Sequence, residues 1–247
     1  MWLKIHDIVF LPSKMLYIES KKALVFADLH LGIEYAYAEE GLFVPPVQFK
    51  RILNDIQKAI KLLKPKTIII NGDLKHKFEQ RTIQEYYEVV RMLEFLMKTE
   101  KNLILVRGNH DTFVRGILRK YGVEVEETAL ELGAYLITHG HKNLDLNDYS
   151  FKTLILAHEH PALLLMDEAG NRERVPCFLY GQFEDINVIV LPAMTPFGGT
   201  DINVPGRMLL SPILRKFDVD RMEAIIATGS LVSRFCSVSK LTFLSSV

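Results

Sequence analysis

Five short segments of the chain carry aspartate, asparagine or histidine directly after an apolar run. They are Asp28-Leu29-His30, Gly72-Asp73, Gly108-Asn109-His110-Asp111, His139-Gly140-His141 and His158-Glu159-His160. Carboxylate, amide and imidazole donors without cysteine suit divalent ions such as Mn²⁺, Fe²⁺ or Zn²⁺. Two ions about 3.5–4 Å apart can polarise a phosphoryl group and stabilise both the attacking and the leaving oxygen. The segments therefore predict a two-metal site for phosphoryl chemistry.

The histidines support one shared site, because only His6 of the eight lies away from these segments. Taken singly, most segments have an ordinary explanation: Gly72-Asp73 alone is a turn, and an aspartate after a strand is commonly a cap. Gly108-Asn109-His110-Asp111 is the most specific of them. Two ions that share one bridging carboxylate need about seven or eight ligand positions. Seven residues supply them: Asp28, His30, Asp73, Asn109, His139, His158 and His160.

The elements that must position these side chains are five short apolar strands. We predict them at residues 23–27, 67–70, 103–106, 135–138 and 153–157. The carboxyl ends of strands in α/β sheets converge on one edge, and ligands bind there. Residues that are far apart in the sequence are therefore expected to meet at this edge.

The remaining patterns predict the rest of the fold. Helical spacing predicts helices at 45–63, 81–98 and 114–121. Further strands are predicted at 8–11 and 15–18, in a meander at 123–125, 130–132 and 135–138, in a hairpin at 162–166 and 174–180, and at 186–191. Phe217, Val219 and residues 241–244 are expected to close the sheets. This order predicts an α/β fold of the α+β type, with two packed mixed β-sheets flanked by helices in a single domain over residues 1–247.

Composition limits the alternatives. The chain has 247 residues, 49% of them hydrophobic, which is enough for a substantial core, and a formal net charge of zero. No overall basic field draws it to nucleic acid, so any such contact must be local. No run approaches the roughly 20 apolar residues of a membrane span, and we expect no membrane contact. Two cysteines are too few for a disulfide framework, so a reducing, cytoplasmic location is expected. The sequence leaves the oligomeric state open.

The order of the five segments resembles the calcineurin-like metallophosphoesterase superfamily, whose fold is a four-layer sandwich around a dinuclear metal centre. The resemblance implies one ion held by Asp28, His30, Asp73 and His160. It implies a second ion held by Asp73, Asn109, His139 and His158, with Asp73 bridging. A metal-bridging hydroxide would attack phosphorus, His110 would protonate the leaving-group oxygen, and Asp111 would orient the His110 imidazole.

A narrower resemblance is to archaeal phosphoesterases related to the DNA-ligase-associated metallophosphoesterases of bacteria. It rests on the irregular segment 192–212, which contains Gly-Gly-Thr-Asp-Ile-Asn, and on Lys75-His76, where many relatives carry a second acidic residue. Ala157 stands where the superfamily usually has glycine. An alanine is tolerated there unless the turn needs a positive φ.

Substrate contacts are predicted for Asn109, Arg107 and His76. Arg107 lies beside the site in the sequence and could hold a phosphate, although a solvent-facing loop charge is the ordinary alternative. Lys75, Lys77 and Arg115 have the same two interpretations. Glu159 should point away from its neighbouring histidines, because strand side chains alternate. We expect the loop 195–203 to form part of the substrate pocket wall.

These observations predict a hydrolase that cleaves a phosphodiester in a nucleotide or a nucleic-acid-derived substrate. Manganese is the expected metal, with iron, zinc and nickel as alternatives. A DNA or RNA nuclease and a phosphomonoesterase remain open within the same chemistry. A catalytically inactive metal-dependent binding protein is the alternative of another class. The pair His110-Asp111 argues against it, because a binding protein needs no general acid.

Overall fold

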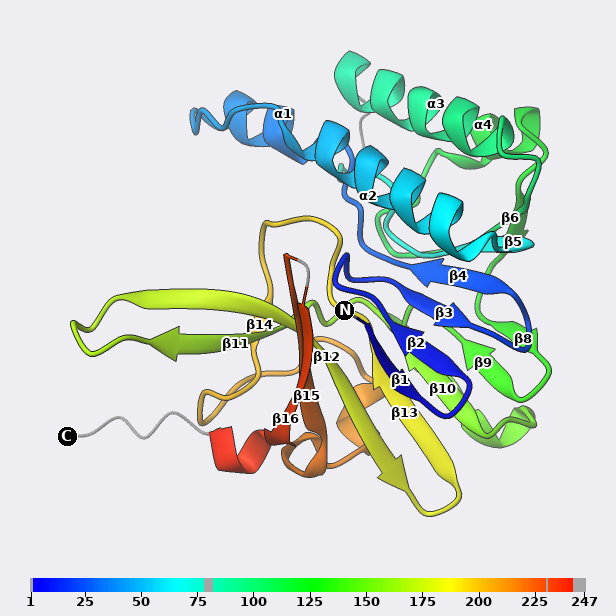
Figure 1. The fold of residues 1–247 in the computed structure, drawn as a ribbon. Coiled ribbons are helices and arrows are strands. Elements are labelled where there is room, and N and C mark those ends of the chain that lie inside the picture. Colours follow the sequence, from blue (N-terminus) through cyan, green and yellow to red (C-terminus); the bar gives the residue numbers. More distant parts are fainter. Residues whose placement is uncertain (1, 78–81, 230, 242–247) are drawn as a thin grey trace.

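The computed structural model describes residues 2–77, 82–229 and 231–241 of the chain (Figure 1). Its first sheet runs in sequence order through β1 (Leu3–Ile5), β2 (Ile8–Phe10), β3 (Leu16–Ile18), β4 (Ala23–Phe26), β5 (Thr67–Asn71), β6 (Asn102–Val106) and β7 (Glu124–Glu126). Strands β1 to β4 are antiparallel, whereas β4 to β7 are parallel. The parallel half carries the predicted site segments at its carboxyl ends.

The second sheet is also mixed. On its main path the order is β14 (Thr200–Asp201), β11 (Pro161–Met166), β12 (Arg172–Phe183), β13 (Ile186–Val190), β10 (Thr153–Leu156), β9 (Tyr135–Ile137) and β8 (Leu130–Leu132). Strand β15 (Glu223–Thr228) pairs with β12 and with β16 (Leu231–Ser237). Strand β10 is parallel to both β9 and β13. In Figure 1 the β11–β12 hairpin projects to the left of the body.

Helices cover the outer face of the first sheet, at the top of Figure 1. They are α1 (Ile33–Glu39), α2 (Gln48–Leu63), α3 (Ile83–Met97) and α4 (Arg115–Lys120). The hydroxyl of Thr82 caps α3 by accepting the Glu85 N–H at 3.0 Å. The outer face of the second sheet packs against loops and the 3₁₀ helices at Leu146–Asp148, Leu214–Lys216, Val219–Arg221 and Val238–Leu241.

Side-chain alternation along the strands builds the layers. In β4, Leu24 and Phe26 face the helices, whereas Ala23 and Val25 face the other sheet. Because successive strand side chains point to opposite faces, a fully apolar strand must be covered on both sides. The predicted arrangement of two packed mixed sheets flanked by helices is therefore confirmed.

Several predicted elements differ from the structure. The expected meander at 123–138 is divided between the sheets, because β7 pairs with β6 in the first sheet while β8 and β9 pair in the second. Helix α1 and strands β15 and β16 were not predicted. Phe217 and Val219 lie at 3₁₀ helices rather than in a strand, and Leu241 ends another. The rest of the expected segment 241–244 and the first residue of the predicted helix 81–98 lie outside the described residues.

Two further properties of the described chain bear on earlier expectations. None of its described helices combines the length and hydrophobicity required to cross a bilayer. Cys177 is buried and Cys236 is exposed, and both are free thiols.

Candidate metal centre

Donor side chains from both sheets meet between the carboxyl ends of their parallel strands. The structure forms one group from Asp28, His30 and His160 and another from Asp73, His139 and His158, each with ligand atoms within 4.8 Å of one another. Each group thus combines donors that follow strands of the first sheet with donors that follow strands of the second.

Asp73 belongs to the second group and also faces the first. Its Oδ2 is 3.3 Å from Nε2 of His139 and 3.7 Å from Nε2 of His30. Oδ1 of Asp28 is 3.3 Å from Nε2 of His160, on the side of His30. Oδ1 of Asn109 reaches Nε2 of His139 at 3.2 Å. All seven predicted ligand residues are therefore brought together, with Asp73 in the central position.

The backbone of the site is held in an unfavourable conformation. Five of its residues have φ in the left-handed region: Asp28 (56°), His30 (45°), Asp73 (51°), His158 (67°) and His160 (48°). Such a conformation costs of order 1–3 kcal/mol for a residue other than glycine, and it clusters at functional sites. Ala157 is not among the residues with positive φ, so the alanine before His158 is tolerated as expected.

Two glycines allow the turns to approach one another. A Cβ on Gly72 would lie 2.1 Å from Nδ1 of His139. A Cβ on Gly108 would lie 2.1 Å from Oδ1 of Asp73. The turns also share backbone bonds, since the Asp28 N–H donates to Gly72 O and the His30 N–H to Asp73 O, both at 3.0 Å. Glycine is therefore needed where the segments cross.

Burial and charge set the protonation states of the donors. Burial lowers the pKa of His30 to about 3 and that of His158 to about 4, so both imidazoles are neutral near pH 7. Burial opposes ionisation of Asp73, but the His139 and His30 imidazoles hold the pKa of that carboxyl below its usual value. Burial also disfavours the charged form of His139, yet the Asp73 and Asp28 carboxylates raise the pKa of His139 to about 9. Near pH 7 the site thus combines neutral imidazoles at His30 and His158, a protonated imidazole at His139 and an anionic carboxylate at Asp73.

Asp111 lies in the turn after β6, but its carboxylate contacts backbone N–H groups rather than the His110 imidazole. Its carboxylate is 3% exposed and accepts the N–H groups of Gly108 at 2.8 Å and of Asp73 and Leu74 at 2.9 Å. Nδ1 of His110 instead contacts the carbonyl oxygen of His76. The expectation that Asp111 orients the His110 imidazole therefore differs from the structure, in which backbone N–H groups take up the carboxylate oxygens.

His76 belongs to the site and Arg107 does not. The His76 imidazole stacks on that of His110, with centroids 5.5 Å apart at 20°, and its Nδ1 is 3.3 Å from Nδ1 of His30. Arg107 instead pairs with Glu127 at 2.9 Å on the surface. Because Glu127 also binds Arg115, the prediction that Arg107 contacts substrate lacks support in this geometry.

A buried charged pair beneath the site was missed by the sequence interpretation. Lys75 is only 1% exposed, and its Nζ lies 3.8 Å from Oε1 of Glu85. The other oxygen of Glu85 accepts the N–H groups of His76 at 3.2 Å and Lys77 at 2.8 Å. Glu85 therefore holds the turn that carries His76. The only local signal was its place three residues after the cap Thr82, which predicts a helix start and no long-range contact.

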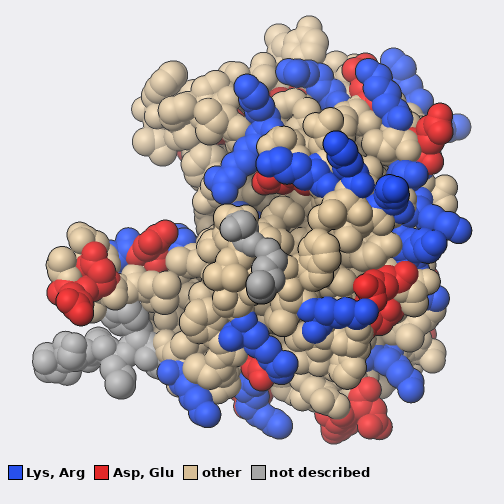
Figure 2. Space-filling model, in the orientation of Figure 1, with Lys and Arg blue, Asp and Glu red and all other residues tan. Residues whose placement is uncertain are grey.

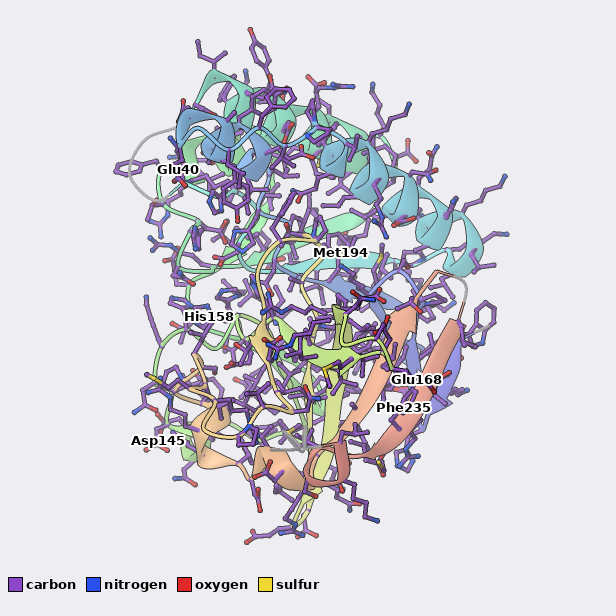
Figure 3. All side chains as sticks on the ribbon, turned by 90° about the vertical axis from the view of Figure 1, so that its left-hand side faces the viewer. Glu40, Asp145, His158, Glu168, Met194 and Phe235 are labelled. Atoms are coloured by element: carbon purple, nitrogen blue, oxygen red, sulfur yellow. The ribbon has the colours of Figure 1, made fainter. Side chains whose placement is uncertain are left out.

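The loop that follows β13 lies against the centre. Thr195 donates its N–H to Asp28 O at 3.0 Å, and Thr200 donates to His160 O at 3.1 Å. Figure 3 shows the loop, labelled at Met194, between the helices and the second sheet. Gln48, which was not among the predicted site residues, holds this loop in place. Its Oε1 accepts a hydrogen bond from the Thr195 hydroxyl at 2.7 Å. This position agrees with the expected role of the loop 195–203 as a pocket wall.

Glu159 and His141 neighbour the donor histidines in the sequence but are not among the predicted metal ligands. Glu159 is fully buried on the far side of its turn, where it accepts the N–H groups of Leu210 and Ser211, each at 2.9 Å. His141 lies with its ring centroid 5.2 Å from that of His139. Its buried Nδ1 has no hydrogen-bond partner among the described residues. The repeated histidine of His139-Gly140-His141 was the sequence signal for this additional imidazole.

The donor set fits divalent metal ions. Oδ1 of Asp28 is buried and has no hydrogen-bond partner among the described residues, although the His160 imidazole is close. A buried carboxylate oxygen without a partner is costly unless a cation or a donor reaches it. Oxygen and imidazole donors without sulfur suit borderline divalent ions.

The family comparison agrees with this chemistry. The model of the calcineurin-like phosphoesterase family matches residues 21–222. A search of curated proteins found no match. Among solved structures, the chain is similar to a Pseudomonas putida nuclease MPE, with a TM-score of 0.66 and 18% identity over 95% of this chain and 100% of that one. It is also similar to YfcE, a phosphoesterase from E. coli, with a TM-score of 0.41 and 15% identity over 87% and 98% of the two chains.

Proposed function

Because the chain belongs to the calcineurin-like phosphoesterase family, and is thus a hydrolase of phosphoester bonds, we propose that it is a two-metal phosphodiesterase. Its proposed substrate is a phosphodiester in a nucleotide or a nucleic-acid-derived molecule. Mn²⁺ is the first metal to test, followed by iron, zinc and nickel.

One observation carries the two-metal proposal. Asp73 belongs to the group Asp73/His139/His158, and its Oδ2 is also close to the group Asp28/His30/His160. That oxygen lies within 4 Å of one imidazole of each group, His139 and His30. A single carboxylate that faces both groups supports a bridging role. We assign Asn109, which contacts His139, to the second group.

Two divalent ions held by these donor residues would supply the charge that polarises the phosphoryl group and lowers the pKa of the attacking water. The chain's own residues supply the remaining steps. The His110 Nδ1–H donates to the carbonyl oxygen of His76, so Nε2 has no hydrogen in the neutral imidazole, and only the protonated imidazole carries a transferable proton there. We assign that proton to the leaving-group oxygen. Asp111 positions the turns by binding the N–H groups of Gly108 and Asp73.

Substrate phosphate contacts are assigned to Asn109 and His76. The Asn109 amide faces the donor groups, and the His76 imidazole lies beside both His30 and His110. Arg107 is not included, because its guanidinium is paired with Glu127.

A nuclease is the second candidate, favoured by two observations. The structure similar to this chain over 95% of its length is named a nuclease. Residues 48–64, along α2, carry five basic side chains and one acidic one, and all five basic side chains are exposed: Lys50, Arg51, Lys58, Lys61 and Lys64. A local basic surface of this kind can contact phosphates even in a chain of zero net charge.

The proposal is tested with purified protein stripped of metal and then supplied with Mn²⁺. Bis(4-nitrophenyl) phosphate should be hydrolysed, and faster than 4-nitrophenyl phosphate. The opposite preference would favour a phosphomonoesterase. Failure to hydrolyse either compound with any of the four metals, while two ions remain bound by elemental analysis, would identify a binding protein instead.

A further inference from the structure

A further cavity lies against the loop that follows β13, which lines it with Met194 and Pro196. It has a volume of about 400 Å³ and lies between the β2–β3 turn, α2, β12 and the end of β15. A volume of 300–1,000 Å³ is typical of sites that bind small ligands. The cavity is therefore large enough for one nucleotide unit.

The cavity continues toward the candidate metal centre. A smaller hollow of about 130 Å³ is lined by His160, Thr195 and Gly198. Both hollows share Arg174, Pro176 and Pro196 in their walls. The two hollows are therefore neighbours with a shared wall, close enough for one chain molecule to reach both.

Positive charge dominates the walls of the larger cavity. Three cations, Lys14, Arg51 and Arg174, face one carboxylate, Asp55. Arg174 is held by a double ion pair to Asp201, at 2.6 and 2.7 Å. Lys14 donates to the carbonyl oxygen of Ala193 at 2.9 Å. Neither cation is therefore mobile.

Arg51 is the cation best able to receive a ligand. It is exposed on α2 and makes no ion pair with any residue in the described ranges. Figure 2 shows Lys and Arg side chains gathered over α2 on this face of the molecule. A guanidinium at the mouth of the cavity can hold a phosphate through two parallel hydrogen bonds.

Apolar side chains form a further part of the wall, beside the polar residues Ser13, Gln48 and Thr228. Proline rings and aliphatic side chains supply this apolar part, namely Pro12, Ile52, Pro176, Met194 and Pro196. Such side chains can pack on the flat face of an unpaired base, whereas a duplex keeps its bases stacked inside. The combination of an anion-binding rim and an apolar wall matches a single strand better than a double helix.

We propose that this cavity binds a nucleotide adjacent to the scissile phosphodiester of a single-stranded nucleic acid, with Arg51 holding its phosphate. This inference rests on the proposed function, because it places the scissile bond at the metal centre. It narrows the substrate class from phosphodiesters in general to a polynucleotide that spans both hollows.

The test measures binding, so it does not depend on turnover. A fluorescent single-stranded 12-mer is titrated with the Mn²⁺-loaded protein on ice and, in parallel, with the Ca²⁺-loaded protein, and anisotropy is recorded at several salt concentrations. Loss of one phosphate contact lowers the slope of log K against log salt by about 0.7 for a single strand. We expect this change, and several-fold weaker binding at low salt, for Arg51→Ala. Arg51→Lys should restore the slope.

Arg119→Ala is the matched control, because Arg119 is an exposed arginine on another helix, α4, and does not line the cavity. The control variant should give the same slope of log K against log salt as the unchanged protein. Equal slopes for Arg51→Ala and the unchanged protein, or equal losses in both variants, would overturn the proposal. A duplex 12-mer that binds as tightly, with the same dependence on Arg51, would overturn the single-strand assignment.

Failure of this inference is distinguishable from failure of the proposed function. Hydrolysis of bis(4-nitrophenyl) phosphate by the unchanged protein tests the metal centre with a molecule too small to span both hollows. If that diester is cleaved and Arg51→Ala has no effect on the 12-mer, the metal centre stands and the cavity assignment is wrong. If the 12-mer binds through Arg51 and no diester is cleaved, the cavity assignment stands and the proposed phosphodiesterase activity is wrong.

Discussion

At the scale of single residues, the orientation of His110 depends on a backbone atom. Its Nδ1 contacts the carbonyl oxygen of His76, and the two imidazoles stack. A carbonyl oxygen accepts a hydrogen bond and cannot donate one, so Nδ1 carries a hydrogen. Nε2 is then the atom that can exchange a proton with substrate, 3.9 Å from Oδ2 of Asp73.

Replacement of His110 by asparagine should remove the proton donor and leave the metal donors in place. We expect kcat for the phosphodiester to fall by roughly 10²–10⁴, with metal content unchanged by elemental analysis. His6→Asn is the control, because His6 is exposed, has a positive φ of 53° that asparagine tolerates, and lies outside the site. Unchanged turnover in His110→Asn would remove His110 from the proposed role.

Asp73→Ala should lower the metal content, unlike His110→Asn, because the Asp73 carboxylate faces both donor groups. Both ions should be lost together rather than one. The measurement is the metal-to-protein ratio after gel filtration, and Asp185→Ala on an exposed turn serves as the control. Retention of one equivalent would contradict a bridging position for Asp73.

At the scale of elements, the site depends on turns that touch. Gly108 follows β6, and a Cβ there would lie 2.1 Å from Oδ1 and 2.5 Å from the backbone N of Asp73. Neither atom can move freely, because Asp73 N–H is bound to Asp111 and Oδ1 accepts the His110 N–H at 2.9 Å. The turn after β6 and the turn after β5 can therefore be this close only with glycine.

The variant Gly108→Ala should displace Asp73 and lower both metal content and thermal stability. Gly116→Ala is a matched control within α4, where a Cβ meets no atom within 4 Å. Alanine is favoured over glycine inside a helix by about 0.5–1 kcal/mol, so the control should raise Tm slightly. Differential scanning fluorimetry and elemental analysis distinguish the two. Normal metal content in Gly108→Ala would show that the turns can separate without loss of the site.

The β2–β3 turn supports the loop after β13 through Lys14. Burial lowers the pKa of Lys14 to about 8; the nearby Arg51 lowers it further and Asp55 opposes this. The unfolded chain has a lysine pKa of about 10.4, so it binds more protons than the fold between these two values. Stability from this group therefore rises as pH increases from about 8 toward 10.4, and the full cost of the charge is present below pH 8.

Comparison of the unchanged protein with Lys14→Met tests this linkage. Methionine carries no charge, so the stability of the unchanged protein relative to the variant should increase by about 3 kcal/mol or less between pH 7 and pH 10. Urea unfolding at three pH values provides the measurement. A stability difference that does not change with pH would mean that Lys14 keeps an ordinary pKa in the fold.

At the scale of the whole molecule, the donors join the two sheets. Asp28 follows a strand of the first sheet and accepts the N–H of His158, which follows a strand of the second, at 3.2 Å. A ligand that binds the folded donors and not the unfolded chain stabilises the fold by RT ln(1 + [L]/Kd). Metal bound between the sheets should therefore stabilise their packing.

Removal of metal with a chelator should lower Tm, and addition of Mn²⁺ should restore it. At a free metal concentration of 100 times Kd the expected stabilisation is about 2.7 kcal/mol. Asp73→Ala should show no such response. An unchanged protein whose Tm is the same with chelator and with Mn²⁺ would argue against metal binding between the sheets.

The sequence by itself determined the local structure on which the site depends. Apolar runs predicted the strands before Asp28, Asp73 and Asn109, and the residue types after them predicted metal donors, because both properties reside in a few consecutive residues. The seven proposed ligands and the two packed sheets follow from these local patterns. The local pattern also placed the loop 195–203 beside the site.

Only the tertiary structure decided which partners these side chains meet. It assigned the Asp111 carboxylate to the backbone of Asp73, paired Arg107 with Glu127, and buried Lys75 beside Glu85. It also opened a cationic cavity against the loop after β13. Each of these contacts joins elements that are far apart in the chain and pack together in the fold. The packing therefore sets which partner each side chain meets, and the local sequence pattern does not contain that information.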